Sequence, residues 1–362
     1  MGGTQMKILF MFTIPSGGMD TLNRQREKAL SSVGIECHFL YRYKGNGIQN
    51  PINSPVFITD DPLEWVEIAL NHHYDAIVIS YDLKMLKAIG ESSFEGVIIY
   101  DNQGLGKRKT YAKQYIQTQA YPFLNQYCDA IMCPKTPHLM DAFSSFFPHK
   151  KKFFVDNGFD TESFRYQAVQ KHPHPIIGWV GRIEENKNWR DFLRIGQSLL
   201  QFYPTLELWI FEDESVSYPS QRKAFQAFLK EEKLESAITI HQSIPHEEMA
   251  RYYSIIGDSG GFLCSTSKVE GFGYAVLEAM LCRCPVLATD SDGVKSFITH
   301  NVTGKFFEIH NIKMAVQEGK ELMEDTSLRS SIVDHAFLHV QRKFSLKQYA
   351  NAFSSMLREL VQ

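Results

Sequence analysis

Two glutamates and two glycines in the C-terminal third of the chain carry the most informative chemistry. Glu270 lies beside Gly271 and Gly273, and seven residues separate Glu270 from Glu278. The apolar run before this segment predicts a buried strand and residues 275–281 predict a helix, so the glycines fall at a strand-to-helix turn. Glycines let a backbone approach a ligand closely, amides at a helix start suit a phosphate, and carboxylates accept hydrogen bonds from vicinal hydroxyls. The segment therefore indicates a ligand with a phosphate and a polyol, such as a sugar nucleotide.

A second strand-to-helix turn carries two cations. Arg182 and Lys187 follow the apolar run 176–180. A guanidinium fork and an ammonium on such a turn can converge on a diphosphate. The alternative is that both side chains only pair with Glu184 and Glu185 at the surface.

The elements that must position these turns alternate between strands and helices. In the first half, apolar runs predict strands at 7–14, 37–41, 76–80, 97–100, 130–133 and 153–155. The polar, proline-marked stretch 167–175 predicts a linker. After it, strands are predicted at 176–180, 206–211, 237–241, 261–264 and 286–289. We expect an α/β fold with two Rossmann-like domains, each on a parallel sheet. The predicted domains are an N-terminal acceptor-side domain at 1–168, a C-terminal domain at 169–340 and a C-terminal helix at 341–362.

The composition narrows the class of protein. The chain has 362 residues, of which 44% are hydrophobic and 22% charged, with a formal net charge of −3. This is ordinary globular usage, and neither half has the basic excess of a nucleic-acid binder. Basic clusters at 107–109 and 149–152 leave a peripheral membrane contact open, with solvated turns as the alternative. The oligomeric state stays open.

Cysteines and histidines give no metal-binding pattern. The six cysteines are scattered, several of them in apolar runs, which predicts buried thiols in a reducing compartment. No apolar stretch approaches ~20 residues and no signal-peptide core is present, so we expect a cytoplasmic protein. The spacing of His72, His73, His138 and His246 predicts no metal site.

These motifs resemble the retaining glycosyltransferases of family 4, which have the two-domain GT-B fold. The segment from Glu270 to Glu278 is similar to the family's signature of two glutamates separated by seven residues. Arg182 with Lys187 resembles its diphosphate clamp. Other similar segments are the glycine loop 16–18, the turn 157–160, the late strand 285–290 and the loop 304–307. The resemblance spans nearly the whole chain and implies two domains facing a cleft, with a C-terminal helix that crosses back to the first domain.

The resemblance also implies roles on the donor side of the site. Glu278 would hold the donor ribose and Glu270 the hydroxyls of the transferred sugar. Phe272, Gly273 and Tyr274 would lie near the sugar or the phosphates.

The departing nucleoside diphosphate would be stabilised by Arg182 and Lys187. Gly17 and Gly18 would line the cleft from the opposite domain, although they could equally form only a tight turn. Contacts to the base are expected from loops near Glu212 and Asp213 and near Ser243 and Ile244.

One position departs from the family pattern. Many members carry a histidine after the strand that here ends Tyr100-Asp101-Asn102, where it contacts the transferred sugar. This chain offers Asp101 or Asn102 instead. Asp101 is therefore a candidate catalytic residue, with an ordinary strand-end turn as the equal alternative.

The resemblance implies an enzyme of the hexosyltransferase type. It would transfer a sugar from a nucleoside diphosphate sugar, with UDP favoured over GDP or ADP, to an acceptor hydroxyl by a front-face mechanism that requires no metal or other cofactor. The acceptor could be a glycan, glycolipid, polyol or small molecule. Two alternatives remain: a sugar-nucleotide epimerase of the same fold, and a non-catalytic sugar-nucleotide binding module.

Overall fold

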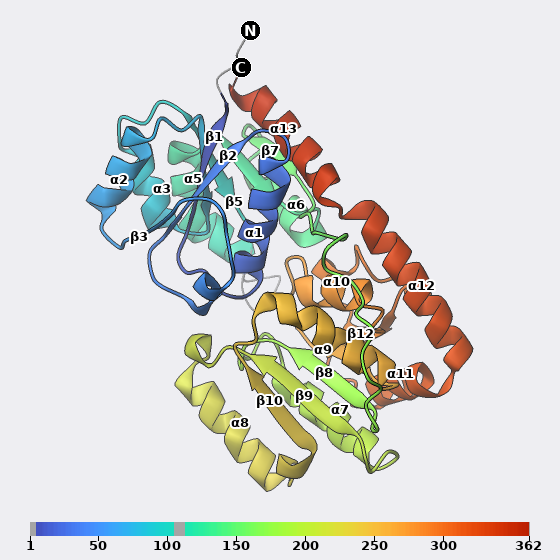
Figure 1. Ribbon diagram of the computed structural model, residues 1–362. Coiled ribbons are helices and arrows are strands. Elements are labelled where there is room, and N and C mark those ends of the chain that lie inside the picture. Colours follow the sequence, from blue (N-terminus) through green and yellow to red (C-terminus); the bar gives the residue numbers. More distant parts are fainter. Residues whose placement is uncertain (1–4, 105–112, 362) are drawn as a thin grey trace. The chain divides into compact units, whose positions relative to one another are not determined.

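The structure is a computed structural model that describes residues 5–104 and 113–361 (Figure 1). The chain divides into two compact units. Unit 1 comprises Met1–Asp160 and Phe344–Gln362, and unit 2 comprises Thr161–Lys343.

Unit 1 is built on a parallel sheet. Within its described residues the sheet has seven strands in the order β3-β2-β1-β4-β5-β6-β7. The strands are β1 (Lys7–Phe12), β2 (Glu36–Tyr41), β3 (Val56–Ile58), β4 (Ala76–Ser80), β5 (Val97–Asp101), β6 (Ala130–Cys133) and β7 (Lys151–Phe154). The helices are α1 (Gly17–Ser31), α2 (Pro62–Asn71), α3 (Leu83–Gly90), α5 (Tyr121–Tyr127), α6 (Pro137–Phe146) and α13 (Leu346–Val361), with short helical turns at Asn46–Gln49 and Ile116–Ala120.

Both faces of this sheet are covered, because its strands are apolar on both sides. Side chains alternate along a strand, so Leu9 and Met11 of β1 enter one core while Ile8 and Phe10 enter the other. The first core is closed by α2, α3, α5 and α6, and the second by α1 and α13. This burial on both faces is what the continuous apolar runs of the sequence predicted.

The C-terminal helix α13 packs on unit 1, beside α1 (Figure 1). Phe353 of α13 lies with its ring centroid 6.0 Å from that of Phe10. Arg26 of α1 donates from Nε to the Tyr349 hydroxyl at 3.0 Å. The predicted return of the C-terminal helix to the first domain is therefore confirmed.

Unit 2 contains a second parallel sheet. Within the described residues its order is β10-β9-β8-β11-β12-β13. The strands are β8 (Ile176–Val180), β9 (Glu207–Glu212), β10 (Ile238–Gln242), β11 (Phe262–Ser265), β12 (Val286–Thr289) and β13 (Lys305–Phe307). The helices are α7 (Trp189–Leu200), α8 (Pro219–Glu231), α9 (His246–Asp258), α10 (Tyr274–Leu281), α11 (Ile312–Glu324) and α12 (Thr326–Lys343), with short turns at Glu214–Val216, Glu235–Ala237 and Asp292–Val294.

Both units share the doubly wound strand order 3-2-1-4-5-6, counted from the first strand of each unit. In such sheets the direction of winding reverses between strands 1 and 4, and ligands bind outside the carboxyl ends of the strands at that switch point. In unit 2 the switch point lies between β8 and β11. The predicted α/β class with two Rossmann-like domains is confirmed.

The boundary between the units falls earlier in the chain than the predicted linker. Residues 161–167 belong to unit 2, whereas the sequence placed them in the first domain. The Tyr166 hydroxyl donates to Asp258 at 2.8 Å, and the Gln167 amide donates to the Ser254 hydroxyl at 3.0 Å. These contacts attach the segment to α9, which local composition does not reveal.

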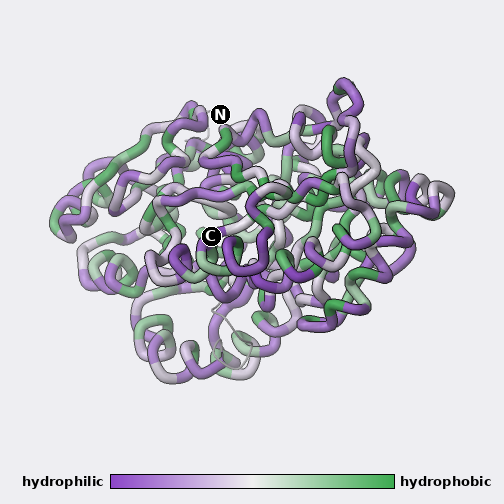
Figure 2. The backbone as a smooth tube through the Cα atoms, turned by 90° about the horizontal axis from the view of Figure 1, so that it is seen from below, coloured by the Kyte–Doolittle hydropathy of each residue, from purple (hydrophilic) through white to green (hydrophobic). Residues whose placement is uncertain are grey.

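Hydrophobic and hydrophilic residues are interspersed along the backbone (Figure 2). Among the described residues, no helix has both the length and the apolar character needed to span a membrane.

Candidate functional site

Loops from neighbouring strands meet at the switch point of unit 2. β8 ends at Val180 and β11 at Ser265, and the two strands pair directly. Because parallel strands end at the same edge of a sheet, the loop after β8 lies beside the loop after β11. These loops carry Arg182, Lys187 and Glu270, the catalytic residues predicted in this half of the chain.

Asn186 ties the two loops together. Its side-chain amide donates from Nδ2 to the Val269 carbonyl at 3.0 Å, and its Oδ1 accepts from the Val269 amide at 3.2 Å. The Asn186 backbone carbonyl accepts from the Lys268 amide at 2.8 Å. The amide side chain thus imitates a strand partner and fixes the residue that precedes Glu270. Sequence analysis missed this role, because a loop asparagine gives no signal of its own.

Lys187 and Glu270 form an ion pair. The Lys187 ammonium lies 2.5 Å from Glu270 Oε1, and the Ser267 hydroxyl donates to the same oxygen at 2.7 Å. The side chains are 22% and 15% exposed, so both can reach a ligand. The ammonium has further hydrogens for an anion, and the carboxylate has further acceptor positions for hydroxyl groups.

Arg182 lies on the same loop but pairs with Glu184. The distance between Arg182 Nη2 and Glu184 Oε1 is 3.0 Å, and the arginine side chain is 53% exposed. The surface pairing considered as an alternative is therefore present for Arg182, whereas Lys187 has the glutamate of the signature segment as its partner.

The glycine turn brings backbone close to backbone. Gly273 precedes α10 with a φ of +88°, a conformation that side chains rarely adopt. A Cβ placed on Gly293 would lie 2.5 Å from the Glu270 carbonyl oxygen. The Phe272 ring packs edge to face on Phe297 with centroids 4.8 Å apart, and it contacts Tyr274 at 5.0 Å. Phe272 therefore anchors the turn with its ring, which leaves its backbone as the part that can face a ligand.

Glu278 is held by two hydrogen-bond donors from α9. His246 Nε2 lies 2.8 Å from Oε1, and the Tyr253 hydroxyl donates to Oε2 at 2.9 Å. Burial, and next the charge of Glu278, raise the pKa of Tyr253 well above its ordinary value, so the hydroxyl keeps its proton. Glu278 itself is 5% exposed. Sequence analysis assigned no role to His246, because no pattern links it to a residue 32 positions away.

The loops predicted to contact a base lie at the same edge of the sheet. Ser243 follows β10 with a φ of +50°, and its amide donates to the Glu212 carbonyl at 2.8 Å. Ile244 is the next residue. The buried Glu212 carboxylate accepts from two nitrogens of Arg222, at 2.8 and 2.5 Å, which fixes the end of β9 against α8.

In unit 1, Gly17 and Gly18 begin α1 and are exposed. Gly17 has a φ of +57°, which suits glycine, and a Cβ there would contact no atom. A tight turn is thus present. The role of both glycines in lining a cleft stays a prediction.

The structure does not support the catalytic role predicted for Asp101. Asp101 is fully buried and forms an ion pair of 2.8 Å with Arg26, which is also fully buried. Ser80 donates to the same carboxylate at 2.8 Å and Gln103 donates at 2.7 Å. A carboxylate enclosed in this way stabilises the end of β5 and cannot contact a substrate.

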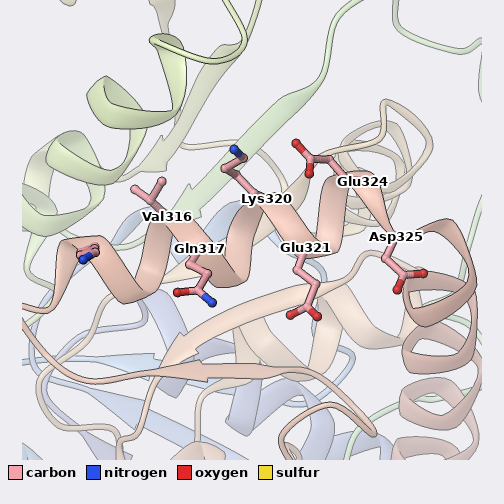
Figure 3. Close-up of a pocket in the computed structure, with 7 residues that line it drawn as sticks. Val316, Gln317, Lys320, Glu321, Glu324 and Asp325 are labelled. Atoms are coloured by element: carbon pink, nitrogen blue, oxygen red, sulfur yellow. The ribbon is translucent and has the colours of Figure 1, made fainter.

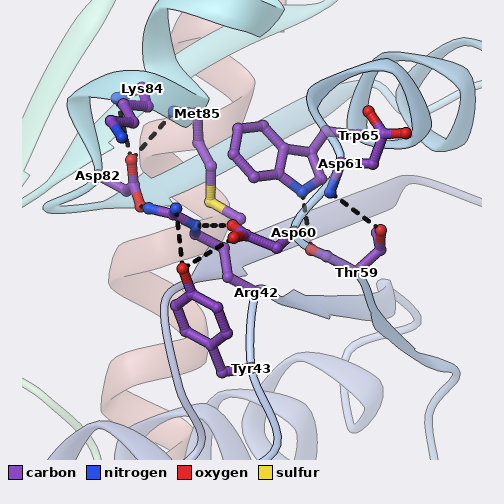
Figure 4. A network of polar contacts seen from close by, with 9 residues as sticks. All are labelled: Arg42, Tyr43, Thr59, Asp60, Asp61, Trp65, Asp82, Lys84 and Met85. Carbon is purple, nitrogen blue, oxygen red and sulfur yellow. Dashed lines mark hydrogen bonds and ion pairs between the residues drawn. The ribbon is translucent and has the colours of Figure 1, made fainter.

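A polar network that the sequence did not indicate crosses the same edge of unit 1 (Figure 4). Arg42, Asp60 and Asp82 follow β2, β3 and β4. Arg42 pairs with Asp60 at 2.5 Å and with Asp82 at 2.8 Å, and Tyr43 donates to Asp60 at 2.8 Å. Arg42 therefore ties three strand ends together.

The basic cluster 149–152 is engaged in the turn between α6 and β7. The Lys150 ammonium donates to the Cys128 carbonyl, and Lys152 donates to the Phe147 carbonyl at 2.6 Å. Lys151 donates to the Glu359 carbonyl at 3.0 Å. These contacts favour a structural turn over a membrane contact. The cluster 107–109 lies outside the described residues.

Within the described residues, neither the cysteines nor the other metal-ligating side chains form a metal site. All six cysteines are buried free thiols, and burial raises the pKa of Cys128 and of Cys284 to about 12. No group of three or more His, Cys, Asp or Glu within residues 5–104 and 113–361 is placed to hold a metal ion. A hollow on α11 (Figure 3) contains none of the predicted site residues; it is lined by Lys313, Val316, Gln317, Lys320, Glu321, Glu324 and Asp325.

Residues 160–338, almost all of unit 2, match the family described as glycosyl transferases group 1. Unit 2, which carries this match, is called the group 1 domain from here on. The match supports the predicted glycosyltransferase class at the level of this domain.

Curated relatives align over part of their length. Alpha-D-kanosaminyltransferase from Streptomyces kanamyceticus is 22% identical over 59% of this chain and 54% of its own. D-inositol 3-phosphate glycosyltransferase from Corynebacterium jeikeium is 25% identical over 51% of this chain and 43% of its own. The chain thus spans about half the length of these relatives, and only 16% of a sucrose synthase from Melioribacter roseus.

Solved structures align over the whole fold. Anabaena Alr3699/HepE in complex with UDP and glucose has a TM-score of 0.80 at 17% identity, covering 98% of this chain and 100% of that one. Sucrose-phosphate synthase from Thermosynechococcus elongatus has a TM-score of 0.79 at 17% identity, covering 98% and 99%. These similarities establish the GT-B class of fold for the two units.

Proposed function

We propose that the protein is a retaining glycosyltransferase of family 4 that transfers a sugar from a nucleoside diphosphate sugar to an acceptor hydroxyl. The observation that carries the proposal is the arrangement of the two signature glutamates. Glu270 lies at the switch point in an ion pair with Lys187, and Glu278 lies on the helix that the glycine turn begins. A cation and a glycine turn whose backbone can approach a ligand suit a diphosphate. Two fixed carboxylates suit the hydroxyl groups of the ribose and of the transferred sugar.

Each group has a role in this proposal. Lys187 and Arg182 stabilise the charge that develops on the diphosphate as it leaves, together with the amides after Gly273. Glu270 orients the transferred sugar through its hydroxyls, and Glu278 binds the ribose. Ser243 and Ile244 contact the base.

Transfer proceeds on one face of the sugar. The bond between the anomeric carbon and the diphosphate oxygen breaks with its electron pair going to the diphosphate. The bond from the acceptor oxygen forms on the same face, and the acceptor proton passes to the departing diphosphate. No protein nucleophile and no metal ion is required. Glu270 then orients the sugar without forming a bond to it.

UDP is the favoured nucleotide. The similar structures of HepE and of a pneumococcal O-GlcNAc transferase are described as complexes with UDP. GDP and ADP are the other candidates. The acceptor is a glycan, glycolipid, polyol or small molecule, and a cytoplasmic location fits six free, buried thiols.

A thermal-shift panel of UDP, GDP, ADP and their sugars tests the donor class. A ligand at 100 times its dissociation constant adds ~2.7 kcal/mol of stability, so one nucleotide and its sugar should raise the unfolding temperature. Glu278→Ala should remove most of that shift. Glu247→Ala, which changes an exposed glutamate on α9, should leave it unchanged.

The outcomes separate the alternatives. If no nucleotide shifts the unfolding temperature, the proposed donor class is wrong. Conversion of the bound donor into its epimer without acceptor would indicate the epimerase. Binding without any transfer or donor hydrolysis would indicate a binding module.

A further inference from the structure

Both carboxylate oxygens of Glu278 already have a protein partner on α9. His246 occupies Oε1 at 2.8 Å and Tyr253 occupies Oε2 at 2.9 Å. A carboxylate is an acceptor-only group with about two acceptor positions on each oxygen. One position therefore remains on each oxygen, which matches a pair of neighbouring hydroxyl groups that donate one hydrogen bond each.

The two donors are themselves fixed from outside the helix that carries Glu278. Phe164 stacks on the His246 ring with centroids 5.0 Å apart at 27°, and it meets the Tyr253 ring edge to face at 6.4 Å. Phe164 is 7% exposed and Tyr253 is fully buried. Both donors thus rest on one aromatic residue of the segment that opens unit 2.

We propose that His246 and Tyr253 are positioning residues that aim the Glu278 carboxylate at the ribose 2′ and 3′ hydroxyls, with Phe164 as their common support. The inference rests on the proposed function. It adds that ribose recognition depends on α9 and on residue 164, neither of which belongs to the two-glutamate segment. Groups that orient a binding residue in this way set its geometry without touching the ligand.

The chemistry of each donor supports this assignment. A carboxylate only accepts, so the His246 nitrogen that faces Glu278 carries the hydrogen. Burial keeps Tyr253 protonated by raising its pKa. Both partners therefore donate a hydrogen bond to the carboxylate and hold it in one orientation.

The test compares two probes that differ only at the ribose, UDP and 2′,3′-dideoxyuridine 5′-diphosphate, by isothermal titration. Wild-type protein should bind UDP at least about 10-fold more tightly, because hydrogen bonds to a charged group are strong. In His246→Ala and in Tyr253→Phe the ratio should fall to about 3-fold or less, with the affinity for the dideoxy probe unchanged. His246→Gln, whose amide nitrogen can replace Nε2, should restore the ratio. Phe164→Leu should lower it in the same way.

Two controls separate positioning from general damage. Glu278→Ala sets the ratio of the two affinities that is expected when no ribose contact remains. Glu247→Gln, which changes an exposed residue of α9, should give the wild-type ratio. Equal weakening of both probes in His246→Ala and Tyr253→Phe would overturn the inference, because it would indicate loss of structure. A wild-type ratio near one would overturn it while leaving the donor class intact. If the wild-type protein binds neither of the two probes, and binds no UDP-sugar, GDP or ADP either, both the inference and the proposed function are wrong.

Discussion

The ion pair between Lys187 and Glu270 brings a cation together with the carboxylate that we propose binds the sugar, at one point of the group 1 domain. Both side chains are partly exposed to solvent. A diphosphate would share the ammonium with Glu270, so the lysine compensates two negative groups at once. Arg182 is more exposed and has a separate partner, Glu184. We therefore expect Lys187 to be the more important of the two cations.

Lys187→Ala should lower kcat by about 10²–10³, because a preorganised charge at a developing oxyanion is typically worth that much. Arg182→Ala should cost less. The measurement is steady-state turnover with saturating donor.

The matched control is Lys268→Ala, which removes a cation from the neighbouring loop, where Lys268 pairs with Glu185 at 3.2 Å. Its kcat should stay within about threefold of wild type, as expected for loss of a surface ion pair. Equal losses in Lys187→Ala and Lys268→Ala would contradict the assignment, since they would point to loop disruption.

The sequence indicated the residues that the proposal places against the ligand, but it did not indicate the residues that hold them. Glycines, cations and glutamates next to strand ends can be recognised in the sequence from their residue type and their position after a predicted strand. Asn186 and His246 act across 83 and 32 residues of sequence, so only the folded chain reveals their partners. The catalytic role predicted for Asp101 was wrong because its position at the end of β5 suggested a site. The buried Arg26 that pairs with its carboxylate lies 75 residues away in the sequence.

At the scale of elements, unit 1 is closed by α13 through a buried polar connection. Arg26 of α1 contacts Asp101 of β5 and Tyr349 of α13, and all three side chains are buried. Burial raises the pKa of Tyr349 to about 12, which keeps its hydroxyl neutral. The arginine thus links the C-terminal helix to the end of a central strand.

Arg26→Met should destabilise the protein by about 3–5 kcal/mol, because it leaves Asp101 as a buried charge without its partner. The double variant Arg26→Met with Asp101→Asn should lose less than the sum of the single changes. Denaturant unfolding of the three variants measures both quantities.

Lys28→Met on the same helix is the control, since Lys28 pairs with Asp160 at the surface and is 50% exposed. It should cost about 1 kcal/mol or less. Additive effects of the Arg26 and Asp101 changes would show that the pair does not stabilise unit 1 as described.

The sequence predicted the strands that have long apolar runs, but it did not predict the short strands or the largely polar helix. The strands at Ala76–Ser80, Ala130–Cys133, Ile176–Val180 and Val286–Thr289 are observed as predicted. β3 and β13 were missed because three residues give no periodic signal. The helix α12 was missed because its buried residues, Ile332, Ala336 and Val340, form a narrow apolar line on a largely polar segment.

At the scale of the whole molecule, the same strand order occurs twice. Alternation of strands and helices predicted two doubly wound sheets, and each sheet has its first strand beside its fourth. This alternation therefore predicted the architecture, and with it the edge of the sheet at which the candidate site of the group 1 domain lies. The boundary was placed eight residues late, at 168 instead of 160, because contacts between the segment 161–167 and α9 decide it.

Retaining sugar transfer by the group 1 domain is tested most directly by ¹H NMR during slow hydrolysis of UDP-α-glucose, or of the α-linked donor that the thermal panel selects, with no acceptor added. Water should replace the diphosphate on the face from which it leaves, so the α anomer of the free sugar should appear first, before mutarotation. Appearance of the β anomer first would contradict retention. Release of no sugar from any donor that binds would contradict transfer chemistry altogether.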